Sequence, residues 1–414
     1  MTAPAHPRTA RASSAAGAIW RDPFLRAAFA SLFLSGIAVS ATVPQMTLFL
    51  VDELGASEPV AGLYYLTNLL APLAGYWLGS LSDRQRDRLT SYRVCSLVGG
   101  VGWVAMALAT QVWMPFAIAA VALSISGASM GLLFAAVRDH LTRHGSTAAH
   151  RVVSAVRMAF TTGWILGPVL GSWFGAVVGL RPLLIATAAL TVGQLLPLGL
   201  QRVVRHTVPA PRTIPDAPGS GEAAPARTSR APLYVFVLAC VLLMNGDTIK
   251  FAFLPLYMAN QLELSDALRG AVIGIQPLVE LALMPLFARL ADRIGPLRVI
   301  TIGAAIGIAA NVAYATSTHV AGLFVGQLLM AALWAAVAGL GVTVAQQLYP
   351  DGVGLASSVF MSSIMLSGGL GGAIGGLGVA LLGIPHIFFV SAVLTALGLV
   401  VLLRLARGQS ASAS

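Results

Sequence analysis

Long apolar stretches, separated by short loops of charged and small residues, follow one another along most of the chain. Each stretch approaches the roughly 20 residues that a helix needs to cross the hydrocarbon of a bilayer. Uninterrupted apolar runs of this length are typical of membrane-spanning helices, whereas strands and surface helices alternate with polar positions. The twelve predicted spans are 26–50, 59–81, 91–111, 115–137, 151–175, 182–202, 232–258, 269–289, 297–316, 320–344, 354–379 and 384–406.

The spans divide into two groups of six. Between the groups, residues 203–231 mix proline with glycine, alanine, serine and arginine, a composition typical of flexible linkers. The first apolar stretch is too long for the core of a signal peptide, so we expect it to be retained as a helix. We therefore expect an all-α membrane protein. Its predicted parts are an N-terminal tail 1–25, a six-helix bundle 26–202, a linker 203–231, a second bundle 232–406 and a tail 407–414.

Composition supports this class and excludes others. Only 10% of the residues are charged and 57% are hydrophobic, whereas soluble domains carry about 25% charged residues. The net charge of +10 does not indicate nucleic-acid binding, because the arginines lie in short loops and form no continuous basic face. Cys95 and Cys240 lie in separate apolar stretches, so we expect packing roles, with neither a disulfide nor a metal site.

The basic residues predict the orientation. If the N-terminus lies inside, only Arg181 and Arg269 fall in outer loops, and only Arg157 and Lys250 fall within spans. All other basic residues then lie on the inner side, as positively charged loops generally do. The first outer loop, at 52–58, is acidic. Both termini and the linker are therefore predicted to be cytoplasmic.

A charged sequence occurs twice. Asp83 and Arg84 follow one span, and Asp292 and Arg293 follow another, an offset of 209 residues (from 83 to 292). The segment 49–54 also aligns with 257–262, at an offset of 208 residues (from 49 to 257). The two halves are thus predicted to be repeats with the same orientation.

Two six-helix halves in parallel repeat, joined by an inner linker, resemble the major facilitator superfamily. Its inner-loop pattern is Gly-x-x-x-Asp-Arg-x-Gly-Arg-Arg. Here the pattern is matched except that Arg86 and Asp87 stand where glycine and arginine are expected. The resemblance implies alternating access, with ion pairs at facing helix ends closing the inner gate; the alternative is that these charges only fix topology. The candidate gating residues are Gly79, Asp83, Arg84, Arg88, Arg138, Asp139, Asp292, Arg293, Gly295 and Arg298.

A second motif concerns the direction of transport. Gly163, Gly167, Pro168 and Gly171 resemble the Gly-x-x-x-Gly-Pro-x-x-Gly-Gly motif of exporters in this superfamily, with Ser172 in place of the last glycine. Small residues at this spacing allow close helix approach, and proline bends the helix. Ordinary close packing is the alternative interpretation. Together with the duplicated loop, the motif favours export over uptake.

Charged residues within spans need a reason, because each costs roughly 2.5–3.5 kcal/mol at mid-membrane. Asp247 and Lys250, the lone lysine of the chain, are three residues apart and can pair on one helix face. Glu280 has no basic neighbour close in sequence. A carboxyl group in a membrane interior can hold and release a proton. Glu280 is therefore our first candidate proton carrier and Asp247 the second; a purely structural Asp247–Lys250 pair is the alternative.

Other polar residues within the spans are candidates for substrate contact. In the superfamily the first, fourth, seventh and tenth helices line the central cavity. The charges of the second half have no charged counterparts in the first half, where hydroxyl and amide groups predominate. For Trp334 simple packing is the alternative. The candidate substrate contacts are Gln45, Asn68, Arg157, Asn245, Lys250, Gln327 and Trp334.

Within the superfamily the chain is most similar to the sugar efflux transporter family. The resemblance rests on the segment 49–54, the Ser-Asp-Arg and Asp87-Arg88 inner loop, the Arg138–Asp139 pair, Arg157 and Glu280. It implies a monomeric exporter of sugars in the bacterial inner membrane, driven by protons and using no cofactor. One departure is that residues 361–369 lack the arginine that this family commonly has in the eleventh span.

Two other functions stay open. A drug or natural-product antiporter on the same fold would show broad selectivity for apolar solutes, and a non-transporting membrane receptor would move none. An enzyme is not expected, because the chain has no phosphate-binding loop, zinc-ligand spacing or nucleophile motif. ATP is therefore not the expected energy source.

Overall fold

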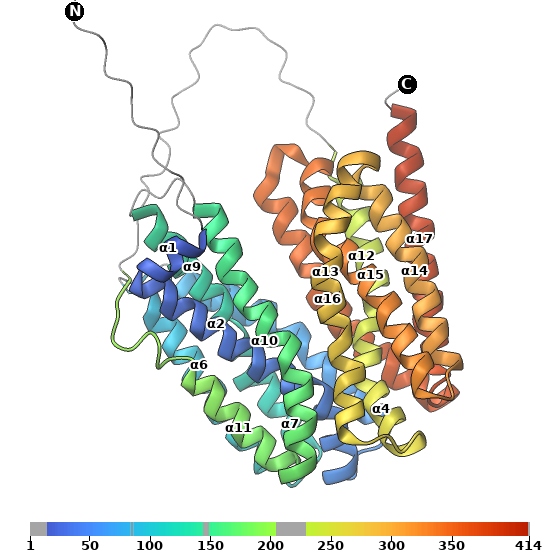
Figure 1. Cartoon of the computed structure of the whole chain (residues 1–414), viewed down its shortest axis with the longest axis horizontal. Coiled ribbons are helices and arrows are strands. Elements are labelled where there is room, and N and C mark those ends of the chain that lie inside the picture. The colour runs from blue at the N-terminus through green and yellow to red at the C-terminus, as the bar shows by residue number, and fades with distance from the viewer. Residues whose placement is uncertain (1–14, 83, 86, 144–148, 204–228, 413–414) are drawn as a thin grey trace, which may run out of the picture.

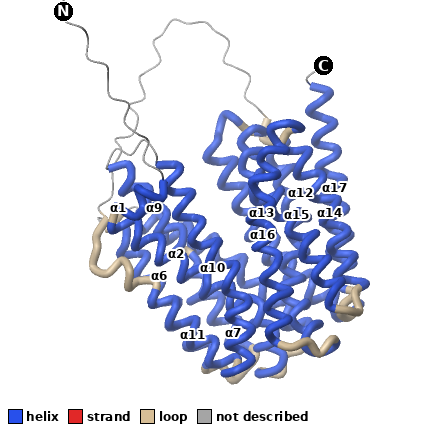
Figure 2. Tube along the Cα trace, in the orientation of Figure 1, coloured by secondary structure: helices blue, strands red, loops and turns tan. Residues whose placement is uncertain are grey.

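The computed structural model describes residues 15–82, 84–85, 87–143, 149–203 and 229–412, which contain helices and no strand (Figure 2). Nine helical segments of these residues are long and apolar enough to cross a membrane. The three other predicted spans coincide with the helical segment 58–82 and with helices α6 and α11. The all-helical membrane architecture is therefore confirmed. The linker 203–231 and the start of the N-terminal tail lie largely outside the described residues, so the division at the linker stays a prediction.

The first half comprises six predicted spans, several of which are built from consecutive helical segments. Helix α1 (Ala15–Arg21) precedes them. The segments are α2 (Pro23–Thr42), η1 (Val43–Gln45), α3 (Met46–Leu48), η2 (Phe49–Glu53), α4 (Glu58–Leu63), η3 (Tyr64–Leu70), α5 (Ala71–Ser82), α6 (Arg88–Ala107), α7 (Trp113–Ile118), η4 (Ala119–Leu123), α8 (Ser124–Gly127), α9 (Ser129–Arg143), α10 (Ala149–Val178) and α11 (Leu180–Gly193).

The second half is more regular. Its segments are α12 (Ala231–Leu256), η5 (Tyr257–Gln261), α13 (Asp266–Ile294), α14 (Pro296–Thr316), α15 (Val320–Leu348), η6 (Pro350–Gly352), α16 (Val353–Leu382) and α17 (Ile387–Ser412). Helix α17 continues to Ser412, beyond the predicted end of the last span at 406.

The backbone repeats the duplication seen in the sequence. The first helix of each half ends in a five-residue π-helical segment, η2 and η5, at an offset of 208 residues (from 49 to 257). The next helices begin at Glu58 and Asp266, each directly after a serine, at the same offset. Because π-helical segments are rare, their recurrence at matching positions supports a true structural repeat.

The charged turns begin the third helix of each half. Asp87 accepts a hydrogen bond from the Leu89 backbone N–H at 3.1 Å and caps α6. Its counterpart Gly295 has φ of +89°, a left-handed conformation that glycine adopts without strain, and it is followed by Pro296 at the start of α14. These two residues therefore have a local reason to be present, apart from any role in gating.

One span is shorter than predicted. The sixth was expected over 182–202, but helix α11 ends at Gly193 and the chain continues in turns to Leu200. Pro197 has no N–H to donate to Gly193, and the amides of Leu195 and Leu196 bond three residues back instead of four. The helix therefore ends before the apolar stretch does.

The two halves meet at one end and diverge at the other. The start of α1 and the end of α17 lie at the same end of the molecule, in different halves (Figure 1); we call this end the terminal side and the opposite end the far side. One apolar core runs through both halves and joins Phe49 and Tyr65 to Phe253 and Met258. A separate core, which includes Leu25 and Val156, belongs to the first half alone.

The exposure of residues along one face of a helix shows where the two halves stop touching. On α16, Gly372 and Gly376 contact the first half, whereas Met365 and Ser358, earlier on the same face, are exposed. On α13, Gly274 contacts α10, whereas Pro285, which lies on the same face and nearer the terminal side, is exposed. The structure is therefore closed on the far side and open between the halves on the terminal side, as the diverging ribbons show (Figure 1).

Candidate functional site

A buried lysine lies in the second half. Lys250 on α12 is 1% exposed and donates hydrogen bonds to Asp247 Oδ1 on its own helix and to Gln276 Oε1 on α13. Its Nζ also lies 4.3 Å from the centre of the Phe251 ring. A lone ammonium group at this depth is strongly unfavourable, so these three partners stabilise its charged form.

A second carboxyl group completes this charged cluster, which consists of Asp247, Lys250, Gln276 and Glu280. Glu280 follows Gln276 by four residues, one turn of α13, and is partly buried. It interacts electrostatically with both Asp247 and Lys250. With one ammonium group and two carboxyl groups, the cluster is neutral only when one carboxyl group carries a proton. The arrangement can therefore store and release a proton.

A neutral polar group lies beside the cluster. Tyr314 on α14 interacts electrostatically with Asp247, and its hydroxyl donates a hydrogen bond of 3.0 Å to Gln327 Oε1 on α15. Gln327 Nε2 and Trp334 Nε1 are buried and have no hydrogen-bond partner among the described residues. Since buried donors without partners are unfavourable, these two N–H groups of α15 are the donors that a buried water or a conformational change would satisfy.

Asn245 is buried on α12, five residues before Lys250. Its Oδ1 has no hydrogen-bond partner among the described residues. The atom faces α16, where a Cβ built on Gly371 would lie 3.2 Å away. Asn245 therefore lies at a close contact between α12 and α16, next to the charged cluster in the chain.

The polar candidates of the first half lie in different surroundings. Gln45 is buried and donates a hydrogen bond of 2.9 Å to Ser172 Oγ on α10, so its amide is engaged within the half. Asn68 on η3 and Arg157 on α10 are exposed, and neither has a hydrogen-bond or ion-pair partner among the described residues. They are available to a solute in this conformation, whereas Gln45 is not.

Arg157 points away from the outer surface of its helix. Leu166, Trp173 and Val177 form the exposed apolar face of α10. Leu166 follows Arg157 by nine residues, about two and a half turns, which places the two side chains on opposite faces. Arg157 is thus exposed on an inner face of the bundle, towards the space that opens on the terminal side.

The Gly-Pro motif joins three helices. Gly163, Gly167 and Gly171 face α2, and a Cβ built on any of them would lie within 2.3 Å of an α2 atom. On another face, the Pro168 carbonyl oxygen lies 3.4 Å from a Cβ built on Gly270 of α13. The motif therefore fixes α10 to α2 and presents its proline turn to the second half at the far side.

The opposite far-side contact is also made by glycines. A Cβ built on Gly62 of α4 would lie 2.6 Å from Gly376 Cα on α16. Gly62 and Gly270 are repeat counterparts at the 208-residue offset (from 62 to 270). The two halves therefore touch through a pseudo-symmetric pair of close glycine contacts, of which the contact at Gly62 leaves no space for a side chain.

On the terminal side, the ion pair formed by the candidate gating residues lies within the first half. Arg88 Nε donates to Asp139 Oδ2 at 2.8 Å, both in the first half. The other described gating candidates, Arg84, Arg138, Asp292, Arg293 and Arg298, are exposed, and Gly79 has open space around its Cα. Asp83 lies outside the described residues. No ion pair between the halves occurs among the described residues here, as expected when this side is open.

Sequence reasoning missed Gln276, Thr248 and Tyr314. Gln276 is the repeat counterpart of Asn68 (from 68 to 276), which was a candidate, so the repeat itself contained that signal. Tyr314 stands in an apolar run with nothing in the sequence to distinguish it, whereas Thr248 lies between Asp247 and Lys250, where the neighbouring charges drew attention away from its hydroxyl group.

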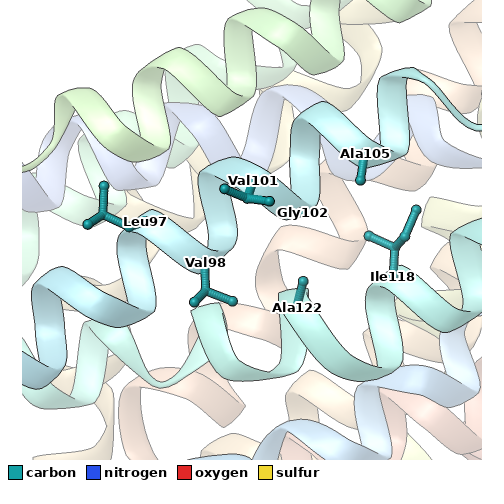
Figure 3. Close-up of a pocket in the computed structure, with 7 residues that line it drawn as sticks. All are labelled: Leu97, Val98, Val101, Gly102, Ala105, Ile118 and Ala122. Carbon is teal, nitrogen blue, oxygen red and sulfur yellow. The ribbon is translucent and has the colours of Figure 1, made fainter.

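An apolar groove lies elsewhere on the molecule. It has a volume of about 320 Å³ and lies between α6 and the α7–η4 segment (Figure 3). Its lining is Leu97, Val98, Val101, Gly102, Ala105, Ile118 and Ala122. Val101 is 70% exposed, so this groove lies on the outer apolar surface and is separate from the polar residues above.

Comparison with known proteins identifies the class. The profile of the Major Facilitator Superfamily matches residues 28–246 and 235–413. The chain therefore belongs to this superfamily, and it is a secondary transporter of small molecules, not an enzyme.

Individual relatives differ in how much of the chain they match. The chain is 27% identical to sugar efflux transporter A of Dickeya chrysanthemi over 351 residues, which cover 83% of this chain and 86% of that one. It is 30% identical to the multidrug resistance protein MdtG of Yersinia enterocolitica over 163 residues, 38% of each chain. Its fold matches the crystal structure of the nucleoside transporter NupG with a TM-score of 0.73, at 17% identity and covering 93% and 98% of the two chains.

Proposed function

We propose that this transporter exports sugars or related small polar solutes in exchange for protons, by alternating access. The proposed coupling of solute to protons rests on the charged cluster. Asp247 pairs with Lys250, and Glu280 is the second carboxyl group, which has no ammonium group of its own. A proton on Glu280 neutralises the cluster, and its loss leaves one negative charge in the membrane interior. That charge difference gives the protonated and deprotonated forms different preferences for conformations in which the cluster is wet or sealed.

The solute class rests on similarity and on the chemistry of the first half. The relative matched over most of the chain is a sugar efflux transporter. The exposed Asn68 amide and Arg157 guanidinium offer directional hydrogen bonds. Such groups bind the hydroxyl groups of a sugar better than they bind the apolar surface of a drug. Asn245, Gln327 and Trp334 each have a buried polar atom without a hydrogen-bond partner among the described residues, and they would extend the polar lining into the second half in a conformation that exposes them. Asp247 is the second proton-carrier candidate.

The orientation and the gate follow from charge and exposure. The distribution of the basic loops supports an orientation with the terminal side in the cytoplasm of a bacterial cell. The protein is proposed to act there as a monomer in the inner membrane. The described conformation is then open to the cytoplasm. In the alternate conformation, the Asp292 and Arg293 turn would approach the Arg84 and Arg88 turn and close the inner gate.

A second candidate is a drug or natural-product antiporter. It is supported by the partial similarity to MdtG. The two functions are separated by assaying purified wild-type protein in proteoliposomes with a panel of labelled mono- and disaccharides and a panel of cationic drugs, with and without a pH gradient.

The expected result is sugar accumulation driven by the gradient, abolished by Glu280→Gln while downhill sugar exchange persists. Accumulation of drugs but no sugar would favour the second candidate. Full gradient-driven transport by Glu280→Gln would remove the carrier assignment. No counterflow with any solute of either panel would contradict both candidates.

A further inference from the structure

The second helix of the first half departs from the repeat. Residues 64–70 form the 3₁₀ segment η3, whereas their counterparts at 272–278 lie within the α-helix α13. Runs of 3₁₀ helix longer than three or four residues are uncommon and often mark functional positions. Asn68 and its counterpart Gln276 therefore lie in different local backbone conformations.

Two pairs of repeat counterparts show the same contrast. Gln276 is buried and accepts a hydrogen bond from Lys250, whereas Asn68 is exposed without a partner among the described residues. Ser40 is buried and donates to the Gly36 carbonyl at 2.8 Å, whereas its counterpart Thr248 (from 40 to 248) has no hydrogen bond within the described part of the chain. In each pair one polar group is used for structure and the other is available.

The two available groups converge at one point. A Cβ built on Gly368 of α16 would lie 3.7 Å from Asn68 Nδ2 and 4.0 Å from Thr248 Oγ1. The adjacent glycine positions are filled, since a Cβ on Gly369 would lie 2.3 Å from Leu69 Cγ. Helix α16 therefore leaves space next to these two polar atoms, which come from different halves.

On α12, the charged residue Lys250 lies on a different face from Thr248. Lys250 follows Thr248 by two residues, about 200° around α12. Its ammonium group is already engaged by Asp247 and Gln276. An amide and a hydroxyl group can each donate to and accept from neighbouring hydroxyl groups of a ligand. The point at Gly368 therefore has the chemistry to recognise a neutral polyol.

We propose that Asn68, Thr248 and Gly368 form a hydroxyl-binding subsite that bridges the two halves and sets the selectivity for neutral, hydroxyl-rich solutes. The inference rests on the proposed function, because it specifies how a sugar is recognised. Gly368 keeps the space free, and Asn68 and Thr248 contact adjacent hydroxyl groups of the solute. Since the two polar groups belong to different halves, a bound sugar links the halves and its hydroxyl pattern influences their closure.

Substitutions with matched controls test the subsite. Thr248→Val removes the hydroxyl group at nearly constant volume, and Thr248→Ser retains it. Gly368→Ala adds a methyl group at ordinary contact distance, so the fold should persist. Gly354→Ala adds the same group on α16 where nothing lies within 4 Å. Each variant is purified in full length and assayed in proteoliposomes with radiolabelled lactose and glucose and their monodeoxy analogues.

For Thr248→Val we expect KM for the transported sugar to rise about 2- to 10-fold, as for the loss of one neutral hydrogen bond. The same variant should no longer distinguish the sugar from the analogue that lacks the contacted hydroxyl group, whereas Thr248→Ser should. Gly368→Ala should raise KM, and Gly354→Ala should leave it unchanged.

The failures are distinguishable. If the wild-type protein transports sugar but Thr248→Val and Gly368→Ala keep its KM and its discrimination between analogues, the subsite is wrong and the proposed function stands. If the wild-type protein transports no sugar of the panel, the proposed function is wrong and the hydroxyl subsite with it.

Discussion

Substitution of Gly62 by alanine tests whether the far-side glycine contacts hold the described conformation. The added Cβ would lie 2.6 Å from Gly376 Cα and 2.8 Å from Gly376 N. Both atoms belong to the backbone of the other half, so neither can rotate away as a side chain does. The strain is relieved only if the halves separate at the far side.

The size of the effect follows from the cost of overpacking. Inserting a methyl group into a filled contact costs about 1–3 kcal/mol. Because this contact exists only while the far side is closed, the cost shifts the conformational equilibrium by about 5- to 150-fold towards the far-side-open state. That state brings the terminal ends of the two halves together.

The assay is a distance measurement across the terminal side. Spin labels at Arg138 and Ser358, one exposed position in each half, should show a shorter distance population in Gly62→Ala than in the wild type. Gly131→Ala is the control, since a Cβ there meets nothing within 4 Å. Gly270→Ala, with a milder approach of 3.1 Å, should give a smaller shift and serves if Gly62→Ala does not fold. Identical distance distributions in all folded variants would refute the reasoning.

Substitutions at Lys250, Asp22 and Arg157 test three individual groups. Lys250→Met should destabilise the protein by about 3–5 kcal/mol because it leaves Asp247 buried and unpaired, and adding Asp247→Asn should restore much of this loss in thermal unfolding; no rescue would contradict the pairing. Burial raises the pKa of Asp22, but hydrogen bonds from His140 and the first turn of α2 outweigh it and leave the pKa lowered, so its stabilisation should be complete above about pH 4 and lost as the pH falls further. At pH 7 Asp22→Ala should cost about 1 kcal/mol and Asp22→Asn less, because asparagine still caps the helix; equal losses would argue against the cap. Arg157→Gln should leave thermal stability within about 0.5 kcal/mol but raise KM for sugar roughly tenfold or more, as for the loss of a hydrogen bond from a charged group, and an unchanged KM would remove Arg157 from the substrate contacts.

The spans were predictable because a membrane-spanning helix requires a long, uninterrupted run of apolar residues. A run of apolar residues as long as the hydrocarbon is thick has few structures open to it other than a helix. The ends of the segments were less predictable. Pro197 ends α11 inside an apolar stretch, and the π-helical segments at 49–53 and 257–261 carry no sequence signal that distinguishes them from α-helix.

The candidate site was predictable only where residues are costly. Asp247, Lys250 and Glu280 stand out because charges in membrane spans are unfavourable, and the structure does bring them together. Gln276 and Thr248 are neutral, and burying them in a membrane span costs little free energy, so the sequence does not mark them. Whether they lie at the site depends on how α12, α13 and α16 cross. Gln45 shows the converse, since a polar residue in the first span is engaged by Ser172 within its own half.

If the proposed exchange of sugar for protons runs through Glu280, the form of the protein that binds sugar binds the proton more weakly. Adding the transported sugar to purified wild-type protein in weakly buffered solution near pH 7 should therefore release protons, with up to one proton per bound sugar, and Glu280→Gln should bind the sugar without release. Sugar binding by the wild-type protein with no proton release at any pH between about 5 and 9 would contradict proton antiport through Glu280.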